Sequence, residues 1–312
     1  MFFLFLCCSF GLFSQKKFSK EISFITENDL YTSTYNDRYY TNGMFLTYRY
    51  VSKEENETLE KKIFEWEIGH QMYTPHKVVT LNLKNHDRPF AGYLYGSFSI
   101  HKVYKNHRSL KTTLQLGAIG THAFSQELQN FIHDLYGFQK AVGWKHQIKN
   151  AVGLNINASY STFLAKDKTN HYDISWISSG KIGTIFTNIS SGFLIRIGFR
   201  PLQSLANSIA YKTTINNSKN AYFREVESFL FIRPSLKYTC YDATLQGSLL
   251  NRGSEVTNEL IPFVVSLELG FKFTANRFNF GYTLKYNSNK SKDLKFNNGH
   301  KYGAISLSYL LQ

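Results

Sequence analysis

Long runs of strictly alternating side chains are the feature that most constrains what this chain can fold into. In 263–273 and 278–287, apolar residues at every second position alternate with small, polar or charged residues. In the first run the apolar side carries Phe263, Val265, Leu267, Leu269, Phe271 and Phe273, and the other side carries Ser266, Glu268, Gly270 and Lys272. The same alternation returns in 301–311. Because successive side chains of a strand point to opposite faces, each run predicts a β-strand with one apolar and one polar face.

The length of these runs separates two kinds of all-β fold. Strands of a soluble β-sandwich are usually about five or six residues long. The runs in this chain are nearer to about ten residues, the length of a strand that crosses a membrane with lipid-facing and lumen-facing side chains in alternation. We therefore predict an antiparallel transmembrane β-barrel of about twelve strands. A soluble sandwich is the alternative fold.

The pattern predicts strands at the following ranges: 20–28, 42–51, 62–72, 91–103, 108–119, 147–163, 188–199, 224–238, 240–250, 262–274, 277–287 and 301–311. An even number of strands brings both termini to the periplasmic side. This places six loops outside the cell: 29–41, 73–90, 120–146, 200–223, 251–261 and 288–300. Segment 164–187 is then expected on the periplasmic side, although it has some alternation of its own.

The N-terminal segment and the charge indicate where the protein acts. Residues 1–14 hold a short apolar stretch followed by small or polar residues, so we expect a signal peptide there and a single outer-membrane barrel domain over 15–312. Removal of the signal leaves Cys240 alone, which excludes an internal disulfide. The net charge of +14 is spread through turns and loops. Nucleic acid or a phosphorylated lipid surface could match this charge, and for an exported barrel we expect the lipid.

Two predicted loops gather polar residues at strand ends. Glu27-Asn28-Asp29 ends the first strand, and Asp37 to Gly43 leads into the second. Their carboxylate, amide and hydroxyl oxygens are hard ligands that suit calcium, although turn formation in an exposed loop also explains them. Asp87-Arg88-Pro89 occupies the loop before a later strand. Arg88 could bind a lipid phosphate with its planar guanidinium group, or form an ion pair within the loop.

One stretch, 123–136, departs from the period of two. Its apolar residues recur at helical spacing at Phe124, Leu128, Phe131 and Leu135, and Gly137 can end the helix. We expect this amphipathic helix to pack its apolar stripe against the barrel wall and to present Gln129 and His133 to a substrate. Histidine suits a general base near neutral pH. The alternative is that His133 is an ordinary surface residue of the helix.

Three groups of motifs occur in order in residues 20–155. They are Glu27-Asn28-Asp29 with Asp37-Arg38-Tyr39-Tyr40-Thr41-Asn42-Gly43; Tyr73-Thr74-Pro75 with Asp87-Arg88-Pro89-Phe90-Ala91-Gly92; and Gly117-Ala118-Ile119-Gly120 through Gln126-Glu127-Leu128-Gln129-Asn130-Phe131-Ile132-His133 to Gly143-Trp144-Lys145-His146-Gln147. Together they resemble the lipid A 3′-O-deacylase family of outer-membrane β-barrels. After residue 155 only the strand pattern continues.

The resemblance implies a site between the barrel wall and a loop helix, acting on lipid A of the outer leaflet with Ca2+. The family's Asn-Asp pair falls on Asn28 and Asp29, its strand threonine on Thr41, and its helix residues on Gln129 and His133. A catalytic loop lysine of the family falls on either Lys77 or Lys84, since the loop after Pro75 differs in length and composition.

Ester hydrolysis then assigns a role to each of these residues. His133 takes a proton from water, and Ca2+, held by Asp29 with Asn28 and Thr41 or backbone carbonyls, polarises the ester carbonyl. Gln129 orients water or substrate. Arg38 and Arg88, with the loop lysines, are expected to bind the glucosamine phosphates. In a regular strand, however, Asn28 and Asp29 point to opposite faces, so either the strand ends early or a bulge re-aims one side chain.

Two functions of other kinds are consistent with the same strand pattern. A passive porin or adhesin needs only the barrel, since the case for catalysis rests on 27–147. A barrel phospholipase would need a serine nucleophile close to a histidine, and no such constellation stands out on the predicted strands. We expect a monomer.

Overall fold

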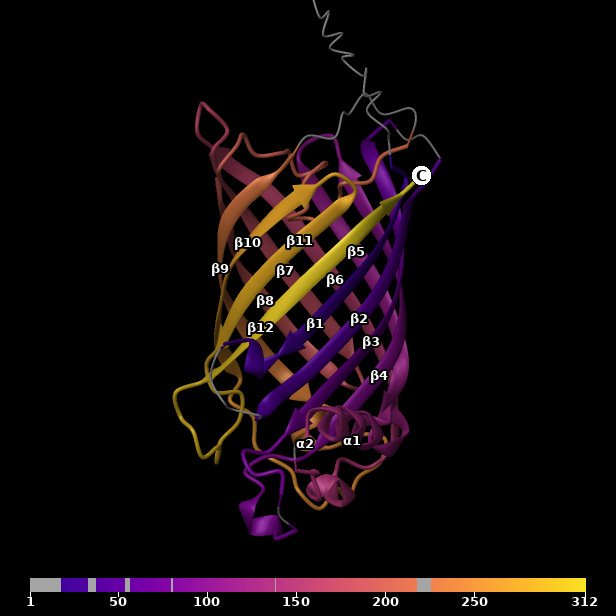
Figure 1. The fold of residues 1–312 in the computed structure, drawn as a ribbon, viewed down its shortest axis with the longest axis vertical. Helices are drawn as coiled ribbons and strands as arrows, with labels where there is room; N and C mark the ends of the chain where they lie inside the picture. The colour runs from indigo at the N-terminus through magenta and orange to yellow at the C-terminus, as the bar shows by residue number, and fades with distance from the viewer. Residues whose placement is uncertain (1–17, 33–37, 54–56, 80, 138, 218–225) are drawn as a thin grey trace, which may run out of the picture.

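The structure is a computed structural model that describes residues 18–312 except 33–37, 54–56, 80, 138 and 218–225. Within these ranges, twelve antiparallel strands form a closed barrel in which each strand pairs with its neighbours in sequence and β12 pairs with β1 (Figure 1). The strands are β1 Lys20–Asn28, β2 Tyr39–Val51, β3 Leu59–Thr74, β4 Ala91–Tyr104, β5 Arg108–Ile119, β6 Ala151–Lys166, β7 Tyr172–Gly183, β8 Phe186–Gly198, β9 Ser228–Asp242, β10 Phe263–Ala275, β11 Phe278–Asn287 and β12 His300–Leu311. The predicted fold class is confirmed.

Helical segments lie mainly in the connections. The helices are α1 Ser125–Tyr136 and α2 Ala243–Gln246, and the 3-10 turns are η1 Asp29–Thr32, η2 Leu83–Asn85, η3 Thr121–Ala123 and η4 Gly143–His146. All of them lie at the end of the barrel away from the C-terminus, which we call the loop end (Figure 1). None of the helices in the described part of the chain is long and apolar enough to span a membrane. The predicted signal peptide, 1–14, lies outside the described residues.

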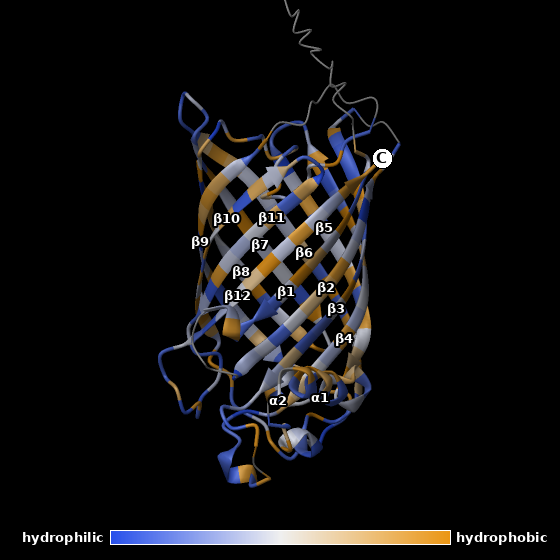
Figure 2. Cartoon of the chain, in the orientation of Figure 1, coloured by the Kyte–Doolittle hydropathy of each residue, from blue (hydrophilic) through white to orange (hydrophobic). Residues whose placement is uncertain are grey.

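The alternation of the sequence sorts side chains between the outside of the barrel and its lumen. Exposed apolar residues such as Phe24, Trp66 and Leu116 point outward. Charged residues such as Glu65 and Arg49 point inward and are buried, where they form an ion pair. Figure 2 shows apolar residues along the strands and mainly hydrophilic residues in the connections at both ends of the barrel. This is the arrangement of a barrel whose outside faces lipid.

Two strand predictions are wrong. One predicted strand is absent and one unpredicted strand is present, so the total of twelve strands is unchanged. The predicted strand 240–250 does not exist, because Asp242 caps a turn of helix through its side chain, which accepts hydrogen bonds from Thr244, and Gly247 ends that turn. Segment 164–187, in contrast, contains β7. Its outward row is interrupted by Ser178 and Gly180, which weakens the alternation.

Moving one strand also moves a loop. The connection between β8 and β9 was predicted outside the cell, as 200–223, but it lies at the end of the barrel that holds the termini. Its Asn216 backbone amide donates to the Phe18 carbonyl, and Ile215 packs against Phe18 and Leu310. The same segment also reaches into the lumen, where Ile209 and other apolar residues pack against inward-pointing side chains of β4, β8 and β9. The other five predicted outer loops lie at the loop end.

Candidate active site on the outer rim of the barrel

Four paired residues, one from each of β1 to β4, form a row across the outside of the barrel at its loop end. All four occupy strand positions that point away from the lumen. Asn28 of β1 pairs with Asn42 of β2. Asn42 in turn pairs with Met72 of β3, which pairs with Gly92 of β4. Paired residues of adjacent strands have Cβ atoms about 5 Å apart, so this row is continuous. Its parity is that of Phe24, an exposed lipid-facing residue of β1. Polar Asn28 and Asn42 thus stand on a face that is mostly apolar.

Asp29 follows the first residue of this row in the chain, and β1 ends one residue before it. Asn28 is the last strand residue, and Asp29 begins η1, so its side chain does not follow the strand alternation. Asp29 is 1% exposed, and its Oδ2 accepts a hydrogen bond of 2.7 Å from the Arg38 backbone amide. The side-chain amide of Asn28 shapes the same turn, since its Oδ1 accepts from the Leu30 amide at 2.7 Å. Because η1 begins at Asp29, strand alternation no longer requires Asn28 and Asp29 to point to opposite faces.

A β-bulge brings Thr41 to the same side of the wall. The register of β2 and β3 shifts between Tyr40 and Asn42, which leaves Thr41 as the extra residue. Tyr40 points into the lumen, where its hydroxyl donates to Glu27 at 2.5 Å. The hydroxyl of Thr41 lies 2.6 Å from that of Thr74, which has the outward parity of β3. Bulges re-aim side chains in this way, often beside functional sites.

Helix α1 lies against the outside of the barrel, beside the loop end of β4 (Figure 1). A Cβ atom at Gly92 would lie 2.0 Å from Ser125 Oγ, so glycine allows the start of the helix to touch the wall. His70 of β3 also points outward. Its Nε2 lies 2.9 Å from the Ala123 carbonyl oxygen and 3.0 Å from Ser125 Oγ. Because Gly92 and His70 face away from the lumen, the helix that covers them is on the outer side.

The helix ends where predicted and begins two residues later than predicted, at Ser125, but it has the opposite orientation. It ends at Gly137, whose φ of 71° is readily available to glycine. However, its polar stripe of Ser125, Gln129 and His133 is buried against the protein, whereas Phe131 is 67% and Leu135 69% exposed. The expectation that the apolar stripe packs on the wall is therefore wrong for Phe124, Phe131 and Leu135, whereas Leu128 packs against Met72 of β3 and its neighbours. On the outside of a membrane protein, apolar side chains do not need protein to cover them.

Gln129 is held by an aromatic residue from the loop after α1. Trp144 Nε1 donates to Gln129 Oε1 at 2.6 Å. Trp144 itself is fully buried and packs with Phe90 and Met72 in a small apolar cluster, to which Leu128 of α1 also contributes. Gln129 Nε2 is buried and has no hydrogen-bond partner in the structure. The tryptophan thus fixes the orientation of the amide and leaves its two N–H donors available.

The ring of His133 is oriented by the loop that follows α1. Its Nδ1 lies 2.6 Å from the Gln139 carbonyl oxygen, and the side chain is buried. A carbonyl oxygen can only accept a hydrogen bond, so in the neutral ring Nδ1 carries the proton. The lone pair is then on Nε2, which is the nitrogen that can accept a proton from water.

At the loop end, beyond this row, Asp87 joins several loops through hydrogen bonds. Its Oδ2 accepts from Tyr39 Oη at 2.8 Å, and its Oδ1 accepts from the His76 amide at 2.9 Å. Burial by itself would raise the pKa of Asp87, but hydrogen bonds from His76 and the Lys295 amide, among others, outweigh burial and hold the pKa below its usual range. Arg88 is buried and donates to the carbonyl oxygens of Tyr39 and Thr244. These contacts favour a structural role for Arg88.

The remaining basic candidates lie in the loops at the loop end. Lys77 and Lys84 line the same polar cavity of about 460 Å³, which also includes Lys295 and Asp87. The guanidinium carbon of Arg38 lies 3.7 Å from the centre of the Phe296 ring. Asp37, quoted in the first motif, lies outside the described residues. Both loop lysines therefore remain candidates for a phosphate contact.

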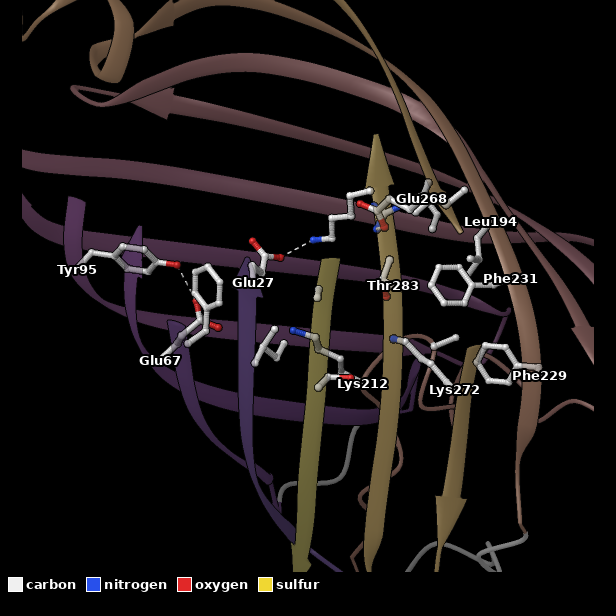
Figure 3. Close-up of a pocket in the computed structure, with 18 residues that line it drawn as sticks. Glu27, Glu67, Tyr95, Leu194, Lys212, Phe229, Phe231, Glu268, Lys272 and Thr283 are labelled. Carbon is white, nitrogen blue, oxygen red and sulfur yellow. Dashed lines mark hydrogen bonds and ion pairs between the residues drawn. The ribbon is translucent and has the colours of Figure 1, made fainter. Parts of the chain in front are cut away.

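The lumen contains a second polar cavity, apart from the one in the loops. A cavity of about 350 Å³ lies among charged residues from both ends of the chain, with Glu27 paired to Lys285 and Glu67 bonded to Tyr95 (Figure 3). Lys212 from the β8–β9 connection also lines it. None of Asn28, Asp29, Thr41, Gln129 or His133 lines this cavity, so the candidate site is separate from the lumen.

The oxygen atoms in and beside the row are of the chemical type that binds calcium. Pairing of β1 with β2 places Asn28 opposite Asn42, whose Oδ1 is buried without a hydrogen-bond partner, and Asp29 and Thr41 are their neighbours in the chain. Their side-chain oxygens are hard ligands of the type that calcium prefers. Within the described residues there is no group of three His, Cys, Asp or Glu side chains that could hold a metal. A calcium ion here would therefore be bound by neutral side-chain oxygens as much as by a carboxylate.

Several residues of the site were not singled out from the sequence. Asn42 and Trp144 stand in the quoted motifs but received no role. His70 could have been noticed because it continues the outward row of Trp66 and Ile68, where an ionisable side chain is unusual. Thr74 carries no signal of its own, since only the bulge explains its contact with Thr41.

The closed barrel, its apolar outside and the polar rim site define an outer-membrane β-barrel protein. A family model described as "Outer membrane protein LpxR" matches residues 1–311, and the chain belongs to this family. Membership assigns it, in general terms, to the outer-membrane lipid A deacylases, which act on lipid A in the bacterial outer membrane. The predicted family and location are confirmed.

One solved structure shows the same fold. "LpxR from Salmonella typhimurium" matches with a TM-score of 0.72 and 18% identity, over 93% of this chain and 99% of that one. The β domain of the Bordetella autotransporter BrkA matches with a TM-score of 0.47 and 9% identity, over 95% of this chain and 100% of that one. A search of the curated proteins gives no match.

Proposed function

We propose that this protein hydrolyses the 3′-linked acyloxyacyl ester of lipid A at the outer rim site, with His133 as the general base. The observation that carries the proposal is the buried polar row beneath α1 on the lipid-facing side of the barrel. An ester of an outer-leaflet lipid can reach this side of the wall without leaving the membrane. A porin or adhesin would have no need of buried polar side chains there, because each costs free energy unless it has a partner.

In this proposal each residue has a chemical task that its contacts support. His133 Nε2 accepts the proton of the attacking water while the Gln139 carbonyl holds Nδ1–H. The free amide donors of Gln129 stabilise the oxyanion of the tetrahedral intermediate, since preorganised donors act strongly in a water-poor site. Asn28, Asp29 and Thr41, with Asn42, would hold Ca2+. When bound, the ion supplies a Lewis acid for the ester carbonyl.

The first prediction concerns the base. Replacing His133 by Ala should lower turnover by about 100-fold or more, the usual contribution of a general base. Lipid A is extracted from cells that express the variant, and the mass loss of the acyl group is measured by mass spectrometry. His122 is the matched control, because it is an exposed histidine of the same loop. Full deacylation by a folded H133A protein would contradict the proposal.

The second prediction concerns the metal. A calcium chelator should abolish the mass shift in purified protein with lipid A, and added Ca2+ should restore it. Asp29→Asn should raise the calcium concentration needed for half-maximal activity, because it removes the one carboxylate of the ligand set. Activity that persists in excess chelator would remove the metal from the proposal while leaving the histidine in place.

Measuring phospholipids in the same extracts separates the substrates. A mass shift in lipid A alone supports the proposal. Release of fatty acid from phospholipids alone would favour the phospholipase alternative. The Lys77→Ala and Lys84→Ala variants then identify which loop lysine contacts the substrate, since that variant should raise KM for lipid A.

A further inference from the structure

Helix α1 has three faces rather than two. At about 100° per residue, Ser125, Gln129 and His133 fall on the buried side. A second arc holds Glu127 and Asp134, which are exposed, and Asp134 pairs with Lys140 in the solvent-accessible loop. The third arc is apolar and holds Phe131 and Leu135, which are 67% and 69% exposed, and Phe124, directly before the helix, is 60% exposed. We call these three residues the outer apolar arc.

The outer apolar arc is on the same side of the wall as the lipid-facing belt. The helix rests on Gly92 and His70, whose strand positions point away from the lumen. Below these positions, the same faces of β3 and β5 carry Ile68 and Leu116, each 61% exposed. The arc therefore extends the apolar outside of the barrel beyond the last outward residues of the strands.

The side chains of the arc are too large and too exposed for a helix that meets only water. Three neighbouring large apolar residues, each more than half exposed, mark a surface that contacts an apolar partner. A helix with one apolar arc, one charged arc and one arc against protein has the form of an interfacial helix, whose apolar side enters the acyl region and whose charged side stays in water.

We propose that the outer apolar arc of α1 is a membrane-contact surface, immersed among the acyl chains of the outer leaflet. Its continuity with the lipid-facing belt favours lipid over a second copy of the chain or another protein. This inference goes beyond the proposed hydrolysis, because it fixes the depth of the helix in the membrane. Its link to catalysis rests on the proposed function: an immersed arc would hold the site at the depth from which an acyl chain can enter beneath α1.

The test places an environment-sensitive fluorophore on the arc. In full-length protein with Cys7, Cys8 and Cys240 replaced by Ser, Leu135→Cys is labelled with NBD and reconstituted into vesicles of phosphatidylcholine with brominated acyl chains. Leu116→Cys is the lipid-facing control. Leu81→Cys, 51% exposed in the loop before η2, is the water control. We expect the label at position 135 to be quenched by bromine to at least half the extent of the label at position 116.

The outcomes decide between the possible partners. A label at position 135 that behaves like the one at position 81, with neither blue-shifted emission nor quenching, overturns the inference. Blue-shifted emission without bromine quenching also overturns it, because the arc would then be covered by protein. Neither result depends on enzymatic activity.

A second measurement connects the arc to turnover. The double variant Phe131→Ser, Leu135→Ser should lower hydrolysis of vesicle-embedded lipid A by at least about tenfold, because it removes two apolar side chains from the acyl region. In detergent micelles the variant should match the unchanged protein. Absence of activity in both proteins would count against the proposed function, whereas the label experiment would still decide whether the arc is immersed.

Discussion

At the scale of single residues, the site depends on side chains whose orientation is set by another residue. His133 is directed by the Gln139 carbonyl and Gln129 by the indole of Trp144. The sequence motifs named His133, Gln129, Asn28 and Asp29 as candidates without showing what holds them. Trp144 in particular was part of a motif but had no predicted role, because a hydrogen bond between a helix and a later loop is not visible in the sequence.

The Trp144 hydrogen bond can be tested with an almost isosteric change. Trp144→Phe keeps an aromatic ring in the cluster with Phe90 and Met72 but removes the donor to Gln129 Oε1. We expect turnover to fall by about tenfold, because a misplaced amide forfeits about 1.4 kcal/mol or more of transition-state stabilisation. Steady-state hydrolysis of lipid A by purified protein measures the effect.

Trp176 provides the control for that experiment. Its Nε1 donates to Ser191 Oγ at 2.7 Å on the lipid-facing side of β7 and β8, so Trp176→Phe removes a comparable hydrogen bond away from the site. This variant should retain full activity. Equal activity of W144F and the unchanged protein would show that the Gln129 orientation is not needed for catalysis.

At the scale of elements, the close contact between α1 and the wall is the feature that makes the site. The helix itself could be predicted, because its spacing of 3.6 residues and its terminal glycine are local signals. Its orientation could not, because an amphipathic pattern does not tell which side of a membrane barrel the helix lies on. The bulge at Thr41 is equally hidden, since it appears only when β2 pairs with β3.

Gly92 tests the importance of this contact. A Cβ atom at Gly92 would lie 2.0 Å from Ser125 Oγ and 2.7 Å from Ser125 Cβ, so Gly92→Ala must move the start of α1 away from β4. We expect a folded barrel with turnover lowered by about 100-fold, because even a shift of about 1 Å at a catalytic group can cost that much. Barrel folding is followed by the heat-dependent mobility shift on a gel, and turnover by lipid A hydrolysis.

Gly96→Ala is the matched control on the same face of β4, because a Cβ atom there meets nothing within 4 Å. It should leave activity unchanged. If G92A were as active as G96A, close packing of the helix on the wall would not be required. Adding Ser125→Gly to G92A should restore part of the activity by removing the clashing side chain.

At the scale of the whole molecule, the connection between β8 and β9 ties the terminus end of the barrel together. Arg196 of β8 pairs bidentately with Asp173 of β7 and also with Glu227, and its guanidinium donates to Ser208 of the connection at 2.6 Å. All three charged side chains are almost completely buried. On the same segment, Thr213 and Ile215 accept hydrogen bonds from the buried ammonium of Lys61.

Removing the central charge should destabilise the whole barrel. Arg196→Met leaves Asp173 and Glu227 buried without their counter-charge, which typically costs about 3–5 kcal/mol. Arg233→Met is the control, because the Arg233–Glu268 pair is 39% and 27% exposed and 3.5 Å apart, and such pairs contribute about 0–1 kcal/mol. Urea unfolding in lipid vesicles, followed by tryptophan fluorescence, should show the difference. Similar midpoints for the two variants would rule out an anchoring role for Arg196.

The sequence by itself determined the barrel, the lipid-facing and lumen-facing sides of most strands and the loop helix, and it named the motif residues of the candidate site. These follow from local rules, because alternation and helical spacing are properties of short segments. The tertiary structure decided the rest: β7 in place of 240–250, the β8–β9 connection at the terminus end, the bulge at Thr41 and the orientation of α1. Each of these depends on which strands pair and on which side of the wall a segment lies, and no short segment carries that information.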